Sequence, residues 1–341
     1  MINQKLSPLY QWKMDQDTTS LVVEFPFPEE TPFNPDIIKI NLNKEKCTLI
    51  VTIPDEKPFI QGTLYKKCNS FTTRTGPHSF FLTLVKDDSE EWPYLIGGWD
   101  PEEKAIDPKS GFDLFVFARK SQNPEMIQQA YQFFDSAISS GYVPALLLGY
   151  EVSIKNPESR NFGMKLLKIA AYHYQDVTAM LKLGCHYELE EKEKNDAFEL
   201  FSQAARKGAY IGMSLMGQMI SPLSEISFYH KDAKEAAQLF EAVLENDPDE
   251  ITSLYEFSKL LYHGVGIEEN KERALEMYEK AKQAEPKLPP IDIIRNKENK
   301  EIEKTPNNFF TPFGIVVIAS CLSFAAASGF LIFRFFKKRK K

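Results

Sequence analysis

The 341-residue chain lacks the motifs that common catalytic and cofactor sites need. It has no phosphate-binding loop, no Gly-x-Gly-x-x-Gly sequence, no serine elbow and no Cys-x-x-Cys pair. Its five histidines are not spaced as metal ligands together with carboxylates or cysteines. We therefore expect a protein that is not an enzyme and that holds no cofactor and no metal ion.

Cysteine is scarce, and the four cysteines are scattered through the sequence. Cys47, Cys68, Cys185 and Cys321 show no disulfide spacing, which indicates free thiols in a reducing compartment. The sequence contains no Asn-x-Ser/Thr sequon, and its first ten residues, MINQKLSPLY, lack the pattern of a signal peptide. Both absences favour a protein whose main part faces the cytosol.

One long apolar run occurs, and it lies near the C-terminus. The stretch FGIVVIASCLSFAAASGFLIF, residues 313–333, carries no charge. As a helix it would extend about 31 Å, close to the thickness of the hydrocarbon core of a bilayer. We predict a single transmembrane tail anchor within residues 309–334, with a buried core helix as the alternative. The residues predicted to contact lipid are Phe313, Ile315, Val316, Val317, Ile318, Leu322, Phe324, Phe330, Leu331, Ile332 and Phe333.

A basic tail, residues 335–341, follows the predicted anchor. By the positive-inside rule it would favour a cytosolic C-terminus. A mildly apolar span with a basic end nevertheless resembles the tail anchors of mitochondrial-type outer membranes, while peroxisomal and endoplasmic-reticulum membranes stay open as alternatives. The basic residues expected to act as the targeting tail are Arg334, Lys337, Lys338, Arg339, Lys340 and Lys341.

The rest of the chain is acidic. The sequence has 41 basic and 48 acidic residues. Six of the basic residues lie after residue 333, so residues 1–333 have 35 basic residues and a net charge of −13. An acidic body disfavours nucleic acid and favours cationic partners, although solubility alone is an alternative reason for the charge.

Short alternations of apolar and polar residues fill the first 120 residues. Apolar residues at every second position lie on one face of a strand, and strands about ten residues apart predict a small antiparallel β-sandwich over residues 1–120. We expect GFDLFVFA, residues 111–118, to form one more strand. The apolar sets are Leu21, Val23 and Phe25; Ile38, Ile40 and Leu42; Leu49, Val51 and Ile53; and Phe80, Leu82 and Leu84.

Several sequence marks follow one another between residues 7 and 95. They are Tyr10-Gln11-Trp12, Asp17-Thr18, PFIQGTL from Pro58, SFTTR from Ser70, Lys86 at the end of FLTLVK, and Trp92 followed by Leu95. In this order they resemble the CS domain, the β-sandwich of small heat-shock proteins and of co-chaperones of heat-shock protein 90. The resemblance implies chaperone or client binding. Trp12 and Trp92 are expected to be packing residues.

From residue 124 to 286 the apolar period becomes helical, and the sequence repeats at spacings of 33, 34, 39 and 38 residues. Positions i, i+4 and i+7 of each copy share one helix face, and a second set of small residues falls between the copies. Two helices per repeat predict an α-solenoid over residues 123–286. The columns are Ala130, Gly163, Ala197, Ala236 and Ala274; Phe134, Leu167, Phe201, Phe240 and Tyr278; and Ala137, Ala170, Ala204, Val243 and Ala281; the second set is Gly149, Gly184, Gly217 and Ser258.

The copy LLYHGVGIEENKERALEMYEKA, with Gly264 and Gly266 in its turn, resembles the Sel-one-like repeat, a relative of the tetratricopeptide repeat. The loop after Ile220, SPLSEISFYHKD, is longer than its counterparts. The resemblance implies that peptides or proteins bind along a concave face lined by the first helix of each pair, with core packing as the alternative for the methionines. The candidate residues are Lys182, Met213, Met216, Met219, Tyr255 and Lys259.

Two charged segments complete the sequence. The acidic run ELEEKEKND, residues 188–196, is expected to be a solvated loop and helix start, with attraction of basic peptides as the alternative. Residues 287–308 combine prolines with mixed charge, which predicts a tether between solenoid and anchor.

This combination of parts resembles the receptor subunits of the protein translocase in the outer membrane of hydrogenosomes, which are mitochondrion-derived organelles. The resemblance implies a tail-anchored outer-membrane receptor with its N-terminal region in the cytosol. Such a receptor binds precursor proteins or targeting peptides and associates with a β-barrel translocation channel. Two alternatives stay open: a membrane-tethered co-chaperone of heat-shock protein 90, and a quality-control scaffold at the endoplasmic reticulum.

Overall fold

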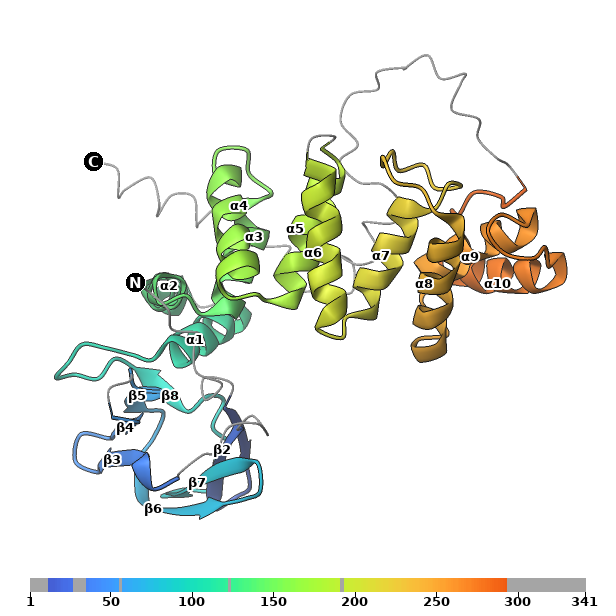
Figure 1. Ribbon diagram of the computed structural model, residues 1–341. Helices are drawn as coiled ribbons and strands as arrows, with labels where there is room; N and C mark the ends of the chain where they lie inside the picture. Colours follow the sequence, from blue (N-terminus) through green and yellow to red (C-terminus); the bar gives the residue numbers. More distant parts are fainter. Residues whose placement is uncertain (1–11, 27–34, 55–56, 122–123, 191–192, 293–341) are drawn as a thin grey trace. The chain divides into compact units, whose positions relative to one another are not determined.

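The computed structural model describes residues 12–26, 35–54, 57–121, 124–190 and 193–292. The chain forms two compact units, the first up to Leu166 and the second from Leu167 onward. The described strands and helices α1 to α3, with most of α4, belong to the first unit, and the later helices belong to the second (Figure 1).

The described strands of the first unit form two antiparallel sheets of four strands each, as predicted. One sheet has the order β1-β2-β7-β6, and the other has the order β3-β4-β5-β8. A short 3-10 helix, η2 (Pro35–Ile37), precedes β3. The strands are β1 (Lys13–Gln16), β2 (Ser20–Pro26), β3 (Lys39–Asn43), β4 (Thr48–Thr52), β5 (Ile60–Leu64), β6 (Cys68–Thr75), β7 (Ser79–Lys86) and β8 (Ile96–Gly98).

The apolar alternation identified in the sequence faces the core of the sandwich. On β2, Leu21, Val23 and Phe25 are buried, and on β7 the buried partners in register are Leu84, Leu82 and Phe80. In the other sheet Leu49 and Val51 of β4 are buried, while β3 contributes partly buried residues. Burial of each large apolar side chain contributes roughly 1.5–3 kcal/mol, so this alternation stabilises the sandwich and sets its register.

The strand predicted over residues 111–118 is wrong, because this stretch lies within helix α1 (Pro108–Ser121). Pro108 occupies the first turn, where its missing N–H costs nothing. The Asp107 carboxylate accepts a hydrogen bond from the Ser110 N–H at 2.9 Å and so caps the helix. Asp107 and Pro108, the helix-start signals before the apolar run, therefore decide that residues 111–118 form a helix.

Helix α1 packs on α2 (Pro124–Ser139) through aromatic side chains. The rings of Phe115 and Phe134 are stacked, with centroids 4.1 Å apart and planes 12° apart. The buried residues Leu114, Phe115 and Ala118 lie on one helix face. They join the same hydrophobic cluster as the sandwich residues, so α1 and α2 extend the sandwich core.

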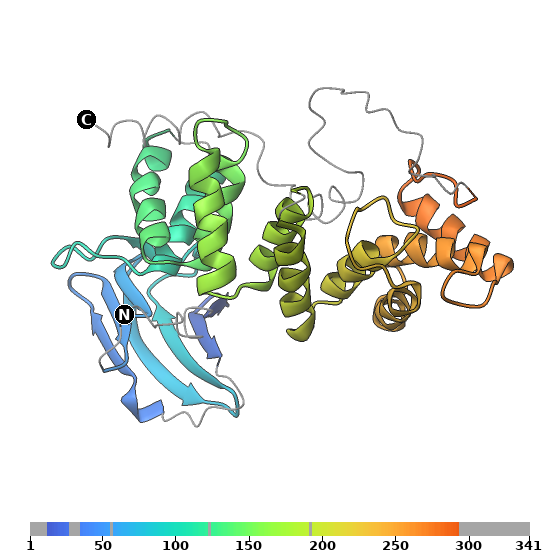
Figure 2. The ribbon, with the colours of Figure 1, turned by 45° about the horizontal axis from the view of Figure 1, so that its top comes forward.

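Helix pairs follow in chain order, which confirms the predicted helical repeats. In the second unit α5 packs on α6, α7 on α8 and α9 on α10 (Figure 2). The helices are α3 (Val143–Ser153), α4 (Arg160–Lys168), the π-helical turn η3 (Ile169–His173), α5 (Val177–Glu188), α6 (Lys194–Arg206), α7 (Tyr210–Ile220), α8 (Ala233–Asn246), α9 (Ile251–His263) and α10 (Lys271–Ala284).

The repeat columns are the buried faces of these helices. Every residue of the three columns is buried. Two glycines of the second set lie against large residues of the middle column. A Cβ on Gly184 would lie 2.4 Å from the Phe201 ring, and one on Gly217 would lie 2.8 Å from the Phe240 ring. The glycines thus let paired helices approach until an aromatic ring rests on the backbone.

The turn between α9 and α10 uses both predicted glycines. Gly264 ends α9 in the left-handed conformation, with φ of 62°, and Gly266 has φ of 74°. Such φ values strain residues that carry a Cβ. A Cβ on Gly266 would in addition lie 2.5 Å from Ala233, at the start of α8.

Residues just after α10 remain packed against α9. Leu288 and Ile291 are buried, and the Ile291 carbonyl oxygen lies 2.8 Å from His263 Nε2. The packed region therefore extends to Ile291, five residues past the predicted end of the solenoid at residue 286.

Within the described ranges, no helix is both long enough and apolar enough to cross a membrane. The predicted anchor (309–334), the basic tail (335–341) and tether residues 293–308 lie outside the described residues. The predictions for these segments therefore stay predictions.

Candidate protein-binding surface

The three methionines predicted to line the concave face lie on α7, and the structure separates them. Met219 has no exposed surface, so it packs in the core. Met213 and Met216 are half-buried. The thioethers that could touch a partner are therefore those of Met213 and Met216, and their role in binding stays a prediction.

A buried polar network joins α7 to α9. Ser214 Oγ donates to Glu250 Oε2 at 2.8 Å, and Ser253 Oγ donates to Ser214 Oγ at 3.0 Å. The Glu250 carboxylate also caps α9 by accepting from the N–H groups of Thr252 and Ser253. The Glu250 carboxylate thus caps the start of α9 and also binds Ser214 of α7. These contacts fix α7 and α9, the first helices of two neighbouring pairs, relative to each other.

Tyr255 and Lys259, the candidate residues on α9, are largely buried. Lys259 Nζ lies 2.7 Å from Glu256 Oε2 in an ion pair, although Oε2 receives no hydrogen bond of good geometry. The same ammonium donates to the Leu223 carbonyl at 3.1 Å and lies 4.7 Å from the centroid of the Tyr255 ring. Lys259 therefore holds internal partners instead of facing an open groove.

The long loop after α7, residues 221–232, supplies the Leu223 carbonyl oxygen that accepts from Lys259. Lys231 Nζ donates to the carbonyl oxygens of Met219, Ser221 and Ile226 at 2.7–2.9 Å, which holds the loop in a compact turn. Phe228 stacks on Phe198 of α6, with centroids 5.3 Å apart. The insertion noted in the sequence is thus a packed element that covers part of α9.

Lys182, the remaining candidate, is also largely buried on α5. One turn away, burial raises the pKa of the Cys185 thiol to about 12, which keeps it protonated and unreactive at neutral pH. Cys47, Cys68 and Cys185, the described cysteines, are free.

A pair of tyrosines beside the acidic run was missed by sequence reasoning. Burial raises the pKa of Tyr172 on η3 and of Tyr187 on α5, and a hydrogen bond between the two side chains raises the pKa of Tyr172 further. Lys168 Nζ lies 5.3 Å from the centroid of the Tyr187 ring. Burial also raises the pKa of Glu188, in the same region, to about 7. Tyr187, directly before the acidic run at residues 188–196, was the available signal in the sequence.

The structure also brings together three residues that sequence reasoning did not connect. One ligand atom each of His230, Asp232 and Glu235 lie within 4.8 Å of one another. Asp232 caps α8 by accepting from the Glu235 N–H at 2.9 Å, and His230 and Glu235 are exposed. Capping of α8 explains the presence of Asp232 at this position. The sequence spacing His-x-Asp-x-x-Glu is the signal from which the group of three residues could have been found.

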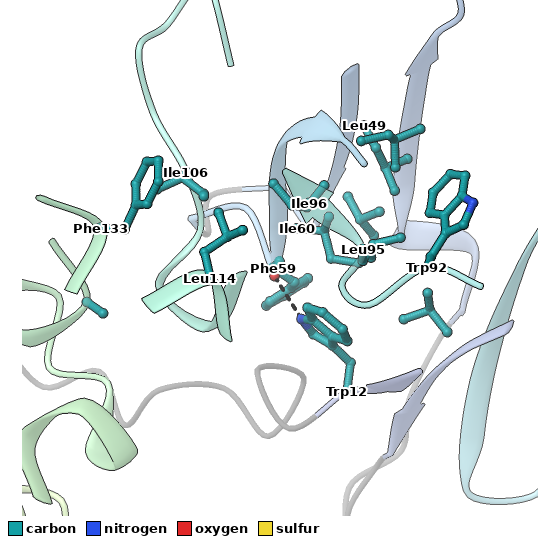
Figure 3. Packing of buried hydrophobic residues seen from close by; sticks show 14 of the residues in the cluster. Trp12, Leu49, Phe59, Ile60, Trp92, Leu95, Ile96, Ile106, Leu114 and Phe133 are labelled. Carbon is teal, nitrogen blue, oxygen red and sulfur yellow. Dashed lines mark hydrogen bonds between the residues drawn. The ribbon is translucent and has the colours of Figure 1, made fainter. Parts of the chain in front are cut away.

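In the sandwich Trp12 and Trp92, two marks of the CS resemblance, are packing residues, as expected. Trp12 and Trp92 are buried, and Trp12 Nε1 donates to the Phe59 carbonyl at 3.3 Å (Figure 3). The Gln16 side-chain amide donates to the Trp92 carbonyl oxygen and accepts from the Trp92 N–H, each at 2.9 Å. Lys86 Nζ donates to the Asp17 and Glu90 carbonyls, so it closes the same corner.

Solved structures similar to parts of this chain include proteins of two kinds. The first kind includes c5321, a protective antigen of uropathogenic Escherichia coli with an SLR fold (19% identity, TM-score 0.43, covering 52% of this chain and 38% of that one). A Sel1 repeat protein from Oxalobacter formigenes is similar at 17% identity and TM-score 0.43, covering 54% of this chain and 76% of that one.

The second kind includes the CS domain of the human KIAA1068 protein, at 22% identity and TM-score 0.22, covering 28% of this chain and 78% of that one. The nuclear movement protein of E. cuniculi is similar at 19% identity and TM-score 0.22, covering 25% of this chain and 98% of that one. No protein-family model matches the chain, and no curated protein matches it. The match to c5321 spans less than half of that protein's length.

Proposed function

We propose that this protein is a membrane-attached receptor that binds precursor proteins, or their targeting peptides, and delivers them to a translocation channel. The observation that carries the proposal is the stack of helix pairs α5–α6, α7–α8 and α9–α10. Each pair buries its repeat column. Stacked helical repeats of this kind provide extended surfaces for peptides and proteins.

The charge of the chain supports a cationic partner. Residues 1–333 carry a net charge of −13, and targeting peptides that fold into amphipathic helices carry lysine or arginine on one face. The apolar face of such a helix needs exposed apolar side chains, and the second unit has them at Ile169, Tyr172 and Leu189. Acidic and apolar features together suit this class of peptide.

A binding titration with the full chain tests the proposal. A fluorescent cationic amphipathic peptide and a control of equal charge with a scrambled apolar face are titrated at about 0.05 M and about 0.5 M salt, because added salt screens exposed charges. We expect the amphipathic peptide to bind about tenfold more tightly than the control at both salt concentrations. Equal binding that salt abolishes would show charge attraction alone, and the heat-shock protein 90 co-chaperone would then be the better interpretation.

Membrane attachment is tested separately. The full chain and a chain ending at residue 308 are expressed in eukaryotic cells, and membranes are extracted with alkaline carbonate. We expect the full chain to stay in the membrane pellet and the shortened chain to be released, because residues 309–334 provide the apolar span. Equal release of both chains would contradict an integral anchor, and co-purification with mitochondrial-type, peroxisomal or endoplasmic-reticulum markers identifies the organelle.

A further inference from the structure

Three large apolar side chains on η3 and at the end of α5, the elements that carry Tyr172 and Tyr187, are exposed. Ile169 and Tyr172 lie one turn apart on η3, with exposed fractions of 43% and 51%. Leu189, 53% exposed, follows Tyr187 by two residues at the end of α5, and η3 packs against α5. Exposed large apolar residues that cluster mark interaction sites more often than ones that occur singly.

Acidic residues border this apolar group. The charges of Glu193 and Asp196 raise the pKa of Tyr187, and that of Asp196 also raises the pKa of Tyr172. Glu193 is the N-cap residue of α6 and Asp196 lies in its first turn, and α6 packs on α5. We call Ile169, Tyr172, Leu189, Glu193 and Asp196 together the Tyr172 surface.

A cation already lies beside this surface, at the neighbouring Tyr187. The Lys168 ammonium is 5.3 Å from the centroid of the Tyr187 ring, a cation–π arrangement in which the ring face attracts positive charge. Because Lys168 is exposed, a basic residue of a partner would compete with it for the same negative field. The π-helical form of η3 also fits a functional position, since single π-helical turns occur frequently at such sites.

We propose that the Tyr172 surface binds a cationic amphipathic helix. The apolar face of that helix lies against Ile169, Tyr172 and Leu189, and its basic residues meet Glu193 and Asp196. This inference rests on the proposed function and gives it a location different from the residues predicted on α7 and α9. Three apolar side chains make a small contact, so the complex is expected to be weak and transient.

The test uses the full chain in detergent micelles, with empty micelles as background, and the two fluorescent peptides described above. Glu193→Gln/Asp196→Asn removes two charges, and we expect about five- to tenfold weaker binding at low salt and little change at high salt. The matched control is Glu268→Gln/Glu279→Gln, which removes two exposed charges beside and on α10 and should leave binding unchanged.

Two further variants separate the apolar contribution from the electrostatic one. Tyr172→Ser should weaken binding about tenfold at both salt concentrations, because salt does not screen apolar contacts. Lys168→Gln should strengthen binding about twofold at low salt, because the competing cation is gone. The Lys168 variant changes only an exposed side chain, so it keeps the test valid even if Tyr172→Ser destabilises the fold.

The outcomes separate this inference from the proposed function. Normal binding by the wild type together with unchanged binding by Glu193→Gln/Asp196→Asn and Lys168→Gln would overturn the Tyr172 surface and leave the receptor proposal standing. A wild type that does not distinguish the two peptides would overturn the receptor proposal, and this inference with it. Weakening by the charge variant, strengthening by Lys168→Gln and no effect of the control support the proposed surface.

Discussion

Gly184 of α5 lies directly against the ring of Phe201 on α6, so closely that an added Cβ would lie 2.4 Å from Phe201 Cε1. Real Cβ atoms do not approach carbon this closely, and the ring would have to move within a packed core. The small residue at this repeat position is therefore a requirement of helix packing.

We expect Gly184→Ala to destabilise the second unit by a net amount of about 1–2 kcal/mol. Overpacking a filled site costs about 1–3 kcal/mol, and the better helix propensity of alanine recovers up to about 1 kcal/mol. Urea unfolding measures the free-energy change. Gly98→Ala is the control, because no heavy atom lies within 4 Å of its added Cβ.

The partner of Gly184 can be tested in the same way. In a double variant, Phe201→Leu should restore part of the stability lost in Gly184→Ala, because the smaller side chain makes room for the methyl group. Additive losses in the two single variants and the double variant would mean that the ring and the glycine do not interact as the structure shows.

Asp107 makes the stability of the first unit depend on pH. Burial raises the pKa of its carboxyl group from 3.8 to about 6, although the Ser110 and Gln61 N–H groups donate to it. A folded-state pKa above the unfolded value means that the contribution is fully present below about pH 4 and is lost as the pH rises through 6. The shift corresponds to roughly 3 kcal/mol as an upper limit.

Asp107→Asn should remove this pH dependence. Asparagine still caps a helix but does not titrate, so the variant should lose the fall in stability that the wild type shows between pH 4 and pH 7. Thermal unfolding at several pH values, compared as the difference between the two proteins, isolates this group from other titrating residues. Parallel profiles would show that Asp107 is ionised with an ordinary pKa.

Lys231 is expected to hold the loop 221–232 in place. Lys231→Met keeps the length of the side chain but removes its three hydrogen bonds to the Met219, Ser221 and Ile226 carbonyls. Hydrogen bonds from a charged donor contribute about 1.5–3 kcal/mol each at most, so the loop should open more often.

Hydrogen exchange measured by mass spectrometry reports this opening directly. Amides of residues 221–232 should exchange faster in Lys231→Met, while those of α10 should not change. The exposed Lys234→Met is the matched control. Equal protection in Lys231→Met and the wild type would show that the aromatic packing of Phe228 holds the loop without the ammonium.

The ion pair of Glu256 and Lys259 should be strongly coupled. Glu256→Gln leaves the largely buried Lys259 ammonium without its counter-charge, and removing one partner of a buried pair costs about 3–5 kcal/mol. Replacing both, as Glu256→Leu/Lys259→Met, should cost much less. Urea unfolding of the single and double variants measures the coupling, and a double variant as unstable as the single one would contradict it.

Some parts of this fold could be predicted from single residues and their spacing. The period-two sets of β2 and β7 and the i, i+4, i+7 columns of the helices follow from the geometry of strands and helices alone, because each puts its apolar residues on one face. Gly264 and Gly266 likewise follow from backbone sterics. These features depend on local structure, which a sequence carries directly.

Other parts required the tertiary structure. The apolar run at residues 111–118 reads as a strand until Asp107 is seen to cap a helix. Lys259 reads as a surface cation until Glu256, Leu223 and Tyr255 are seen around it. Tyr172 and Tyr187, 15 positions apart in the sequence, become neighbours only because η3 packs on α5.

The sequence by itself determined which faces must be buried, since burial of apolar area follows from periodicity. Only the tertiary structure decided which polar groups find partners and which stay open to another molecule, because hydrogen bonds and ion pairs depend on distances between segments that the chain order does not specify.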